Sequence, residues 1–455
     1  MIQNKVKSKL IFTEKRFNAG YFLNEDALNS FKLEINPKNC IALSELANVF
    51  NPPIFKRQFC QPSERAINYC QSSDVTNALE GSDVYINKKQ AEKVGSVVKK
   101  NQILVTGFAT IGNTRLVNEL SEGISYANNV CRIESNGKFP YGYLYAFMTS
   151  KFGKSQLNKN ASGSVVRYIE APGIKRTLVP ILPEEKQQQI HQLIVDSANL
   201  RVEANKLLKE AVELIERNLD VKITKPINKF NSKKVNIKSL FDSDQKRLDS
   251  PVYITDSSNY LKSNNKFLSI NELGFNVYRP GIFKRIKVDK ANGIPYIKGS
   301  DLNKNNPFNN CEFLSKTKTP FMNEMILKED QILFTCAGSI GDVKLITKEF
   351  VDNPAIGSQD IIRIENKNNS IPIEFLFAYL KTKFSFDYIQ SIKYGSVIER
   401  VEPFHVESIP VQNFSDDIII KVKDLIENYK HAFYTSFKKE NQAINLIENE
   451  IDAWQ

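Results

Sequence analysis

The chain is a duplication of one unit. LSELANVFNPPIFKR, ending at Arg57, and NQILVTGFATIGN, residues 101–113, return as INELGFNVYRPGIFKR, ending at Arg285, and DQILFTCAGSIGD, residues 330–342. Further pairs follow in the same order: NVCRIE and DIIRIE, LYAFMTSKF and LFAYLKTKF, and GSVV and GSVI. Because the order is kept and the separation changes by only a few residues, chance does not explain the pairs. We therefore expect two similar halves related by an internal pseudo-twofold repeat, not a solenoid.

Each copy ends in a long segment that contains neither proline nor glycine. The first begins near Glu184, directly after Pro183, and reaches Leu219, and the second runs from Asp416 to Asp452. A proline at the start and acidic residues in the first turn both favour a helix. The first helix, of about 36 residues, would span ~54 Å.

A heptad repeat marks one face of these two segments. Apolar or small residues recur at two positions of the heptad, which predicts an a/d seam between two antiparallel coiled-coil helices of the same chain. Two unrelated surface helices would also fit the periodicity taken alone. The residues assigned to the seam are Ile190, Leu193, Leu200, Leu207, Leu214, Val422, Leu425 and Leu446.

The remainder of each copy mixes strands and helices. ILVT at 103–106 and VCRIE at 130–134 are typical of buried strands, and an amphipathic helix is expected at 141–152 in the first copy and at 373–384 in the second. The fold class is α+β. We divide the chain into a first globular domain (1–183), a first long helix (184–221), a polar linker (222–238), a second globular domain (239–414) and a second long helix (415–455).

The charge balance favours a polyanionic partner. Sixty-two Lys and Arg against fifty-one Asp and Glu give a net charge of +11, which suits nucleic acid. No hydrophobic run approaches the ~20 residues that a membrane span needs, and residues 1–10 lack the apolar core of a signal peptide. We expect a cytoplasmic protein. Six scattered cysteines and three histidines predict no metal site and no disulfide framework.

Two motifs resemble catalytic signatures, but their surroundings do not support catalysis. NPPI at 51–54 is similar to the Asn-Pro-Pro-aromatic loop of amino-methyltransferases, yet its fourth residue is Ile54 and the second copy has YRPG, so a turn is the better interpretation. Glu184, Glu185 and Lys186 contain the glutamate and lysine of a nuclease triad without its aspartate, and they fit the start of a helix. We predict no catalytic residue.

Polar and basic residues gather at three turns in each copy. One follows the ILVT or ILFT strand, one is the Pro or Gly turn before Lys-Arg, and one is the GSVV or GSVI loop. Such residues can contact phosphates or base edges, and differences such as Asn113 against Asp342 would let each copy read a different half-sequence. A connection needed only for folding, or a solvated face, is the alternative. The candidate DNA-binding residues are Lys56, Arg57, Thr106, Thr110, Asn113, Arg115, Ser164, Arg167, Lys284, Arg285, Thr335, Ser339, Lys344, Tyr394, Ser396 and Arg400.

These features resemble the specificity subunit of type I restriction-modification enzymes. The resemblance rests on two similar globular regions that close with a GS-V motif and an IP or VP strand, on PEEKQQQI at the start of a long helix, and on ILFTCAGSIGDVKLI. It implies two target recognition domains that read the halves of a split DNA sequence and are held apart by two antiparallel helices. QNFSDDIII departs from the family's usual second helix start.

The resemblance also implies a set of partners. They are double-stranded DNA, methyltransferase subunits, two in number, and a restriction and translocase subunit. The chain itself would bind no cofactor, and S-adenosylmethionine, ATP and Mg²⁺ are expected on the partner subunits. Two alternatives stay open: the recognition part of a related type IIB or IIG-like restriction-methylation enzyme, and a protein adaptor without affinity for DNA.

Overall fold

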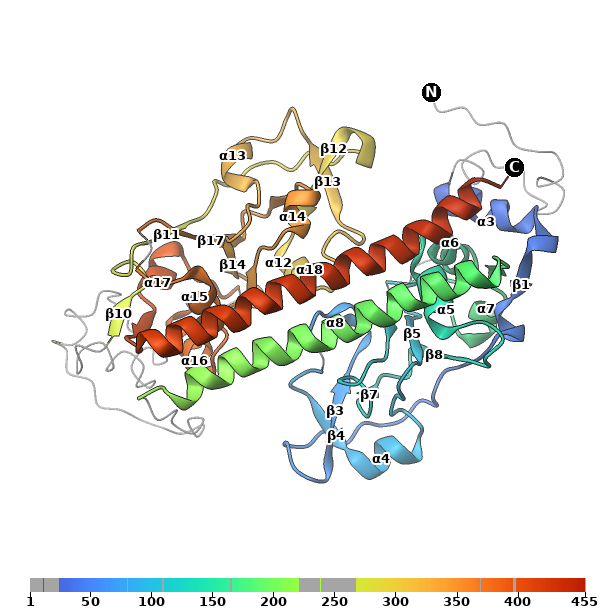
Figure 1. Cartoon of the computed structure of the whole chain (residues 1–455), viewed down its shortest axis with the longest axis horizontal. Helices are drawn as coiled ribbons and strands as arrows, with labels where there is room; N and C mark the ends of the chain where they lie inside the picture. The colour runs from blue at the N-terminus through green and yellow to red at the C-terminus, as the bar shows by residue number, and fades with distance from the viewer. Residues whose placement is uncertain are drawn as a thin grey trace. The chain divides into compact units, whose positions relative to one another are not determined.

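The computed structural model describes residue 11 and residues 24–454, apart from 80, 109, 164–165, 221–237, 239–266, 369 and 396–397. The predicted linker at 222–238 therefore falls, except for its last residue, outside the described residues. The chain forms two compact units (Figure 1). Unit 1 comprises residues 1–202 and 435–455, and unit 2 comprises residues 203–434, so each long helix contributes to both units.

Unit 1 is built on a four-stranded antiparallel sheet of order β2-β8-β5-β6. A three-stranded sheet of order β4-β3-β7 and the pair β1-β9 complete it. The strands are β1 (Cys40–Ala42), β2 (Ala47–Phe50), β3 (Ala66–Cys70), β4 (Tyr85–Asn87), β5 (Ile103–Thr106), β6 (Thr114–Leu116), β7 (Ser125–Tyr126), β8 (Val130–Ser135) and β9 (Leu178–Pro180). The helices are α3 (Glu25–Glu34), η1 (Pro37–Asn39), η2 (Leu43–Glu45), η3 (Ser72–Thr76), α4 (Lys88–Lys93), α5 (Tyr141–Thr149), α6 (Lys151–Lys159), α7 (Ala171–Lys175) and the first part of α8 (Glu184–Arg217).

Unit 2 repeats this topology. Its four-stranded sheet has the order β11-β17-β14-β15, its three-stranded sheet the order β13-β12-β16, and β10 pairs with β18. The strands are β10 (Phe267–Ser269), β11 (Phe275–Tyr278), β12 (Gly293–Ile297), β13 (Glu312–Ser315), β14 (Ile332–Thr335), β15 (Val343–Leu345), β16 (Ile356–Gly357), β17 (Ile361–Asn366) and β18 (Pro410–Gln412). The helices are η4 (Lys290–Asn292), α12 (Gly299–Leu302), α13 (Met322–Met325), α14 (Glu349–Asp352), α15 (Ile373–Leu380), α16 (Lys383–Ile392), α17 (Pro403–Glu407) and the first part of α18 (Asp416–Asp452).

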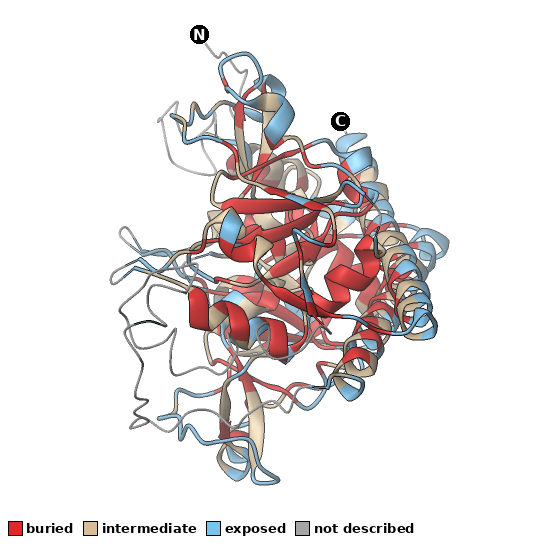
Figure 2. Cartoon of the chain, turned by 90° about the vertical axis from the view of Figure 1, so that its left-hand side faces the viewer, coloured by how far each residue is buried: buried red, intermediate tan, exposed pale blue. Residues whose placement is uncertain are grey.

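The strands predicted at 103–106 and 130–134 are confirmed, but the helix predicted at 141–152 is wrong in its extent. It is two helices, because the Ser150 side chain accepts a hydrogen bond from the Gly153 N–H and starts α6. Thr382 does the same for α16 in unit 2. Almost every residue of α5 and of α15 is buried, so neither is amphipathic (Figure 2).

The two long helices are confirmed close to their predicted limits. α8 has 34 residues and α18 has 37 residues. Among the helices of the described residues, none combines the length and the apolar character that a membrane span requires. The boundaries drawn from the sequence between globular domains and long helices stay predictions, since each compact unit contains part of both helices.

The buried face of α8 is wider than the two predicted rows. The row that begins at Ile190 is buried, as expected. The row of Leu193, Leu200, Leu207 and Leu214 is half-buried, with Leu193 and Leu214 packed against the two cores, and the residues one position later are fully buried. Those residues are Ile194, Arg201, Leu208 and Ile215. On α18, Val422 is buried, whereas Leu425 and Leu446 are half-buried beside the buried Ile426 and Ile447.

Within unit 1 the two long helices pack in opposite directions. Asp196 pairs with Lys439 at 2.8 Å, and Lys186 pairs with Glu450. Rising residue numbers on α8 thus meet falling numbers on α18. The contact is close, because the hydroxyl groups of Ser197 and Ser436 are 3.0 Å apart.

A buried polar trio lies in this seam. The guanidinium of Arg201 donates a hydrogen bond of 2.8 Å to Glu440, and the Tyr145 hydroxyl donates to the same carboxylate. Burial opposes the charge on Glu440, but Arg201 and the hydroxyl of Tyr145 outweigh it and lower the pKa of the carboxyl below its ordinary value. Arg201 and Glu440 therefore stay ionised inside the protein, while the Tyr145 hydroxyl stays neutral.

Candidate nucleic-acid interface

One edge of each four-stranded sheet collects the predicted turns. β2 and β5 both run antiparallel to β8, so their C-terminal ends lie at the same edge. The segment from Asn51 onward and the turn that follows β5 therefore start at the same end of the sheet, on either side of β8. Asn51 fixes a third loop there, because its side chain accepts a hydrogen bond from the Ala171 N–H. In unit 2, β11 and β14 bring the corresponding segments together in the same way.

The turn after β5 is held by a threonine. The Thr106 hydroxyl donates to the Thr110 carbonyl and accepts a hydrogen bond of 3.0 Å from the Asn113 N–H. Thr335 does the same with Ser339 and Asp342 in unit 2. Both threonine side chains are buried, so they shape the turn and leave Thr110 and Ser339 exposed at its tip.

The GSVV loop is joined to this turn by backbone pairing. Tyr168 forms isolated bridges with Ser162 and with Phe108, and the Phe108 and Tyr168 rings stack at 6.2 Å. The φ of Gly163 is +91°, and a Cβ there would collide with the Val166 carbonyl oxygen, so only glycine fits. This geometry explains the glycine of the GS-V motif.

The same loop recurs in unit 2. Arg400 bridges to Tyr394 and to Ala337, and the φ of Gly395 is +102°. The Tyr394 hydroxyl donates to Glu402 at 2.7 Å. The candidates Ser164 and Ser396 lie outside the described residues.

The basic candidates divide into exposed and buried residues. Lys56, Arg57, Arg167, Lys284 and Arg285 are exposed at the edge, while Asn113, Tyr394 and Arg400 are half-buried. Arg285 lies 3.7 Å from Asp360, and the Arg167 guanidinium donates to the Asn158 carbonyl. The sheet edge thus presents cations in both units.

Two basic candidates are not at the surface. Arg115 is buried and donates hydrogen bonds to the carbonyls of Val75 and Asn77. Lys344 is buried with its ammonium 4.9 Å from the centre of the Phe433 ring. We leave Arg115 and Lys344 out of the proposed contact set, because their charged groups are held inside the protein.

Each unit also has one buried arginine that joins its four-stranded sheet to its three-stranded sheet. Arg132 donates to the carbonyls of Ser96 and Tyr126 and so ties β8 to β7. Arg363 donates to the carbonyls of Ser358 and Gly357 and ties β17 to β16. Burial lowers the pKa of each guanidinium to about 10. The sequence patterns VCRIE and IIRIE did not indicate that these arginines would be buried and would join two sheets.

The sequence analysis missed the apolar surface at this edge. Ile54 is 84% exposed and Ile282 is 75% exposed. Each directly precedes a Phe-Lys-Arg segment. Phe108, Val166, Tyr168 and Ile398 are also exposed. The repeat in the sequence could have drawn attention to this surface, because IFKR is identical in both copies.

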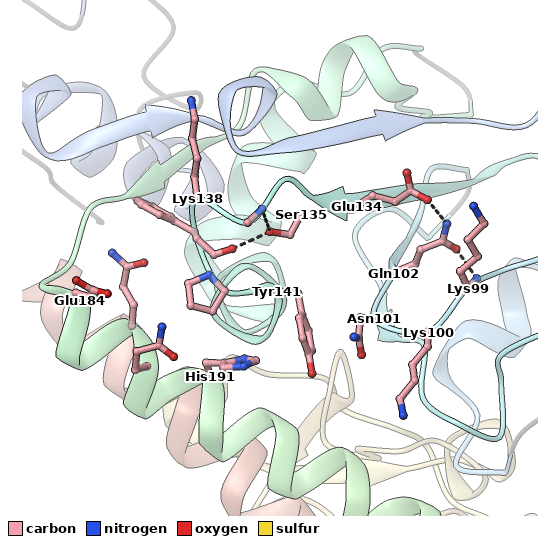
Figure 3. Close-up of a pocket in the computed structure, with 15 residues that line it drawn as sticks. Lys99, Lys100, Asn101, Gln102, Glu134, Ser135, Lys138, Tyr141, Glu184 and His191 are labelled. Carbon is pink, nitrogen blue, oxygen red and sulfur yellow. Dashed lines mark hydrogen bonds between the residues drawn. The ribbon is translucent and has the colours of Figure 1, made fainter.

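The opposite edge of the sheet in unit 1 borders an open polar groove of about 780 Å³ (Figure 3). It is lined by residues from the start of β5, the end of β8 and the first turns of α8, among them Lys99, Glu134 and Glu184. The His191 ring meets the Tyr141 ring edge-on at 4.7 Å, and burial lowers the pKa of His191. Within the described ranges, no group of three His, Cys, Asp or Glu side chains is placed to hold a metal ion.

A repeated set of loops, with exposed cations at the same sheet edge in both units, defines a duplicated polyanion-binding protein. The model of the type I restriction modification DNA specificity domain matches residues 16–214 and 262–412, so the chain belongs to that family. It is a DNA-specificity subunit of a type I restriction-modification system. A comparison with curated proteins found no match.

Solved structures of such subunits are similar to this chain. The S subunit from M. genitalium is 15% identical, with a TM-score of 0.31 and coverage of 90% of this chain and 94% of that one. HsdS from Thermoanaerobacter tengcongensis is 12% identical, with a TM-score of 0.28 and coverage of 91% and 97%. The type IIG restriction endonuclease BpuSI is 10% identical, with a TM-score of 0.27 and coverage of 85% of this chain and 46% of that one.

Proposed function

We propose that each unit reads one half of a split DNA sequence with the loops at its sheet edge. The observation that carries this proposal is that one scaffold is repeated while the residues of its turns differ. Thr110 and Asn113 in unit 1 correspond in the repeat to Ser339 and Asp342 in unit 2. Amide and carboxylate groups favour different base edges, so the two units would prefer different half-sites.

The long helices would set the distance between the half-sites. A helix of 34 residues is about 51 Å long, and one turn of DNA is about 34 Å. Two antiparallel coiled-coil helices of this length would hold the two recognition domains, related by a pseudo-twofold axis, about one DNA turn apart. The length of the helices would then define the non-specific spacer.

The chain would act as a non-catalytic subunit that positions other proteins. We propose that two methyltransferase subunits and a restriction and translocase subunit assemble on it. S-adenosylmethionine, ATP and Mg²⁺ would bind to those subunits and not to this chain. Since the target is genomic DNA, we expect the assembly in the cytoplasm.

Binding to duplex DNA tests this function directly. A gel-shift titration of the full chain with a duplex that carries the host's methylated bipartite site should give binding that weakens steeply with salt, because Lys and Arg displace counterions from phosphates. A duplex with both half-sites scrambled serves as the control and should bind more weakly. Absence of binding to either duplex would favour a protein adaptor, and methyl transfer by the purified chain would favour a fused restriction-methylation enzyme.

A further inference from the structure

The segment IFKR is identical in the two units and occupies the same place in both. Residues 54–57 follow β2 after the pair Pro52-Pro53, and residues 282–285 follow β11 after the pair Pro280-Gly281. Both segments leave the sheet edge that carries the other candidate loops. The neighbouring turns 107–113 and 336–342 differ between the units, so the identity of IFKR is specific to this segment.

In unit 1 the segment has an anchored side and an exposed side. Phe55 packs against the apolar cluster around Tyr69, and the Arg57 guanidinium lies 5.5 Å from the centre of the Tyr69 ring. In an extended segment, alternate side chains point to opposite sides. Ile54 and Lys56 accordingly face solvent, and Ile54 is 84% exposed.

Unit 2 reproduces this arrangement with its own tyrosine. Phe283 packs against the cluster around Tyr296, and the Arg285 guanidinium lies 5.6 Å from the centre of the Tyr296 ring. Ile282 is 75% exposed, and Lys284 is exposed beside it. Two aromatic anchors therefore present the same pair, an isoleucine and a lysine, in both units.

Single exposed apolar side chains are common on protein surfaces, so exposure by itself assigns no role. A pair repeated with the same anchor in both units fits a partner that offers the same surface to each unit. Two half-sites differ in their bases but share phosphates, sugars and groove walls. Lysine suits the phosphate, and isoleucine suits the apolar sugar edge or a base step within a groove.

We infer that Ile54 and Ile282 are apolar contacts to duplex DNA, each placed in a groove beside the phosphate bound by Lys56 or Lys284. They act in the same way at both half-sites, whatever the base sequence. This inference rests on the proposed function. The IFKR segments would then bind DNA in the same way in both units, while the turns that differ between the units would read the bases.

Fluorescence anisotropy of the full chain with two labelled duplexes tests the inference. One duplex carries the bipartite site defined by methylated adenines in host DNA, and the other has the same length and a random sequence. Ile54→Ala and Ile282→Ala should each weaken binding to both duplexes about tenfold, because each loses part of a buried apolar contact. The two isoleucine variants should not change the salt dependence of binding. Lys56→Gln should lower the magnitude of the slope of the logarithm of the binding constant against the logarithm of the salt concentration by about one.

Matched controls come from the same residue type elsewhere. Ile181, 46% exposed between β9 and α8, and Ile420, 54% exposed on α18, should tolerate alanine without loss of DNA binding. A loss confined to the target duplex would overturn the inference in favour of base reading. Unchanged DNA binding with weaker assembly of methyltransferase subunits would overturn it in favour of a protein contact, and a lower melting temperature would indicate a structural role.

The inference and the proposed function fail in different ways. If the unmodified chain binds neither duplex, the proposed function fails and the inference fails with it. If the unmodified chain binds and both isoleucine variants bind equally well, only the inference fails.

Discussion

The Thr106 hydroxyl closes the turn between β5 and β6 by bonding to two backbone groups of that turn. Thr106→Val keeps the shape of the side chain and removes both bonds. We expect the free energy of unfolding to fall by about 1–3 kcal/mol, because buried backbone groups lose their partner. Chemical denaturation measures this loss.

Thr110→Val, at the exposed tip of the same turn, is the matched control. It should leave the free energy of unfolding within about 0.5 kcal/mol of the unmodified chain. The opposite ranking of the two variants would contradict the structural role given to Thr106.

These residues also mark what a sequence can predict about the site. The repeat and the polar turns pointed to segments that meet at one edge of the sheet, where Lys56 and Arg167 are exposed. The same pattern could not separate them from Arg115, because burial of that side chain depends on the carbonyls of residues 75 and 77, which reach it only in the folded unit. Side-chain burial is a tertiary property that a polar pattern does not encode.

At the scale of elements, the long helices were predictable, and the full width of their buried face was not. Pro183 and the absence of later prolines or glycines define the start and length of α8. The heptad has apolar residues at both 193 and 194, and Leu193 gave the more regular row. The more deeply buried row includes Arg201, a charged residue that periodicity counts as surface, although its charge is satisfied by Glu440. This additional buried row therefore could not be predicted from the heptad.

The trio around Glu440 has an apolar counterpart in unit 2. The repeat aligns Tyr145, Arg201 and Glu440 with Phe377, Phe433 and Leu208, all of them buried. Unit 1 thus uses an ion pair where unit 2 uses apolar packing.

Single and triple variants of the trio should have opposite effects on stability. Glu440→Leu alone removes the carboxylate that Arg201 binds inside the protein and should cost about 3–5 kcal/mol of unfolding free energy. The triple variant Tyr145→Phe, Arg201→Phe and Glu440→Leu should be neutral or up to about 4 kcal/mol more stable. Urea denaturation of both variants checks this, and additive losses in the triple variant would argue against it.

The same trio predicts how stability depends on pH. The pKa of Glu440 is lowered in the folded protein from its ordinary value of 4.5, so its ionised form contributes stability above that value. This contribution should be lost as the pH falls below 4.5 and through the lowered pKa. Glu440→Gln should remove this contribution, so the free energy of unfolding should fall less steeply as the pH is lowered into the acid range.

Denaturation midpoints from neutral pH to acid pH measure this difference. Other acid-sensitive pairs, such as Asp196 with Lys439, are present in both proteins and cancel in the comparison. Parallel acid limbs for the two proteins would show that folding does not lower the pKa of Glu440.

At the scale of the whole molecule, the duplication and the two helices together predict a ruler. The boundary between the units crosses α8 after Val202 and α18 after Tyr434. Adding one heptad to both helices at these points keeps the buried rows in phase. Seven residues add about 10.5 Å of helix, or roughly three base pairs at ~3.4 Å each.

Such a variant should recognise the same two half-sites with a longer spacer. Mapping of methylated adenines in cells that carry the variant and the partner subunits measures half-sites and spacer together. A heptad added to α8 alone is the control, because it puts the Ser197 and Ser436 contact out of register with the rest of the seam and should destabilise the protein. If the double insertion left the spacer unchanged, the helices would not set it, and the separation of the half-sites would have to come from the partner subunits.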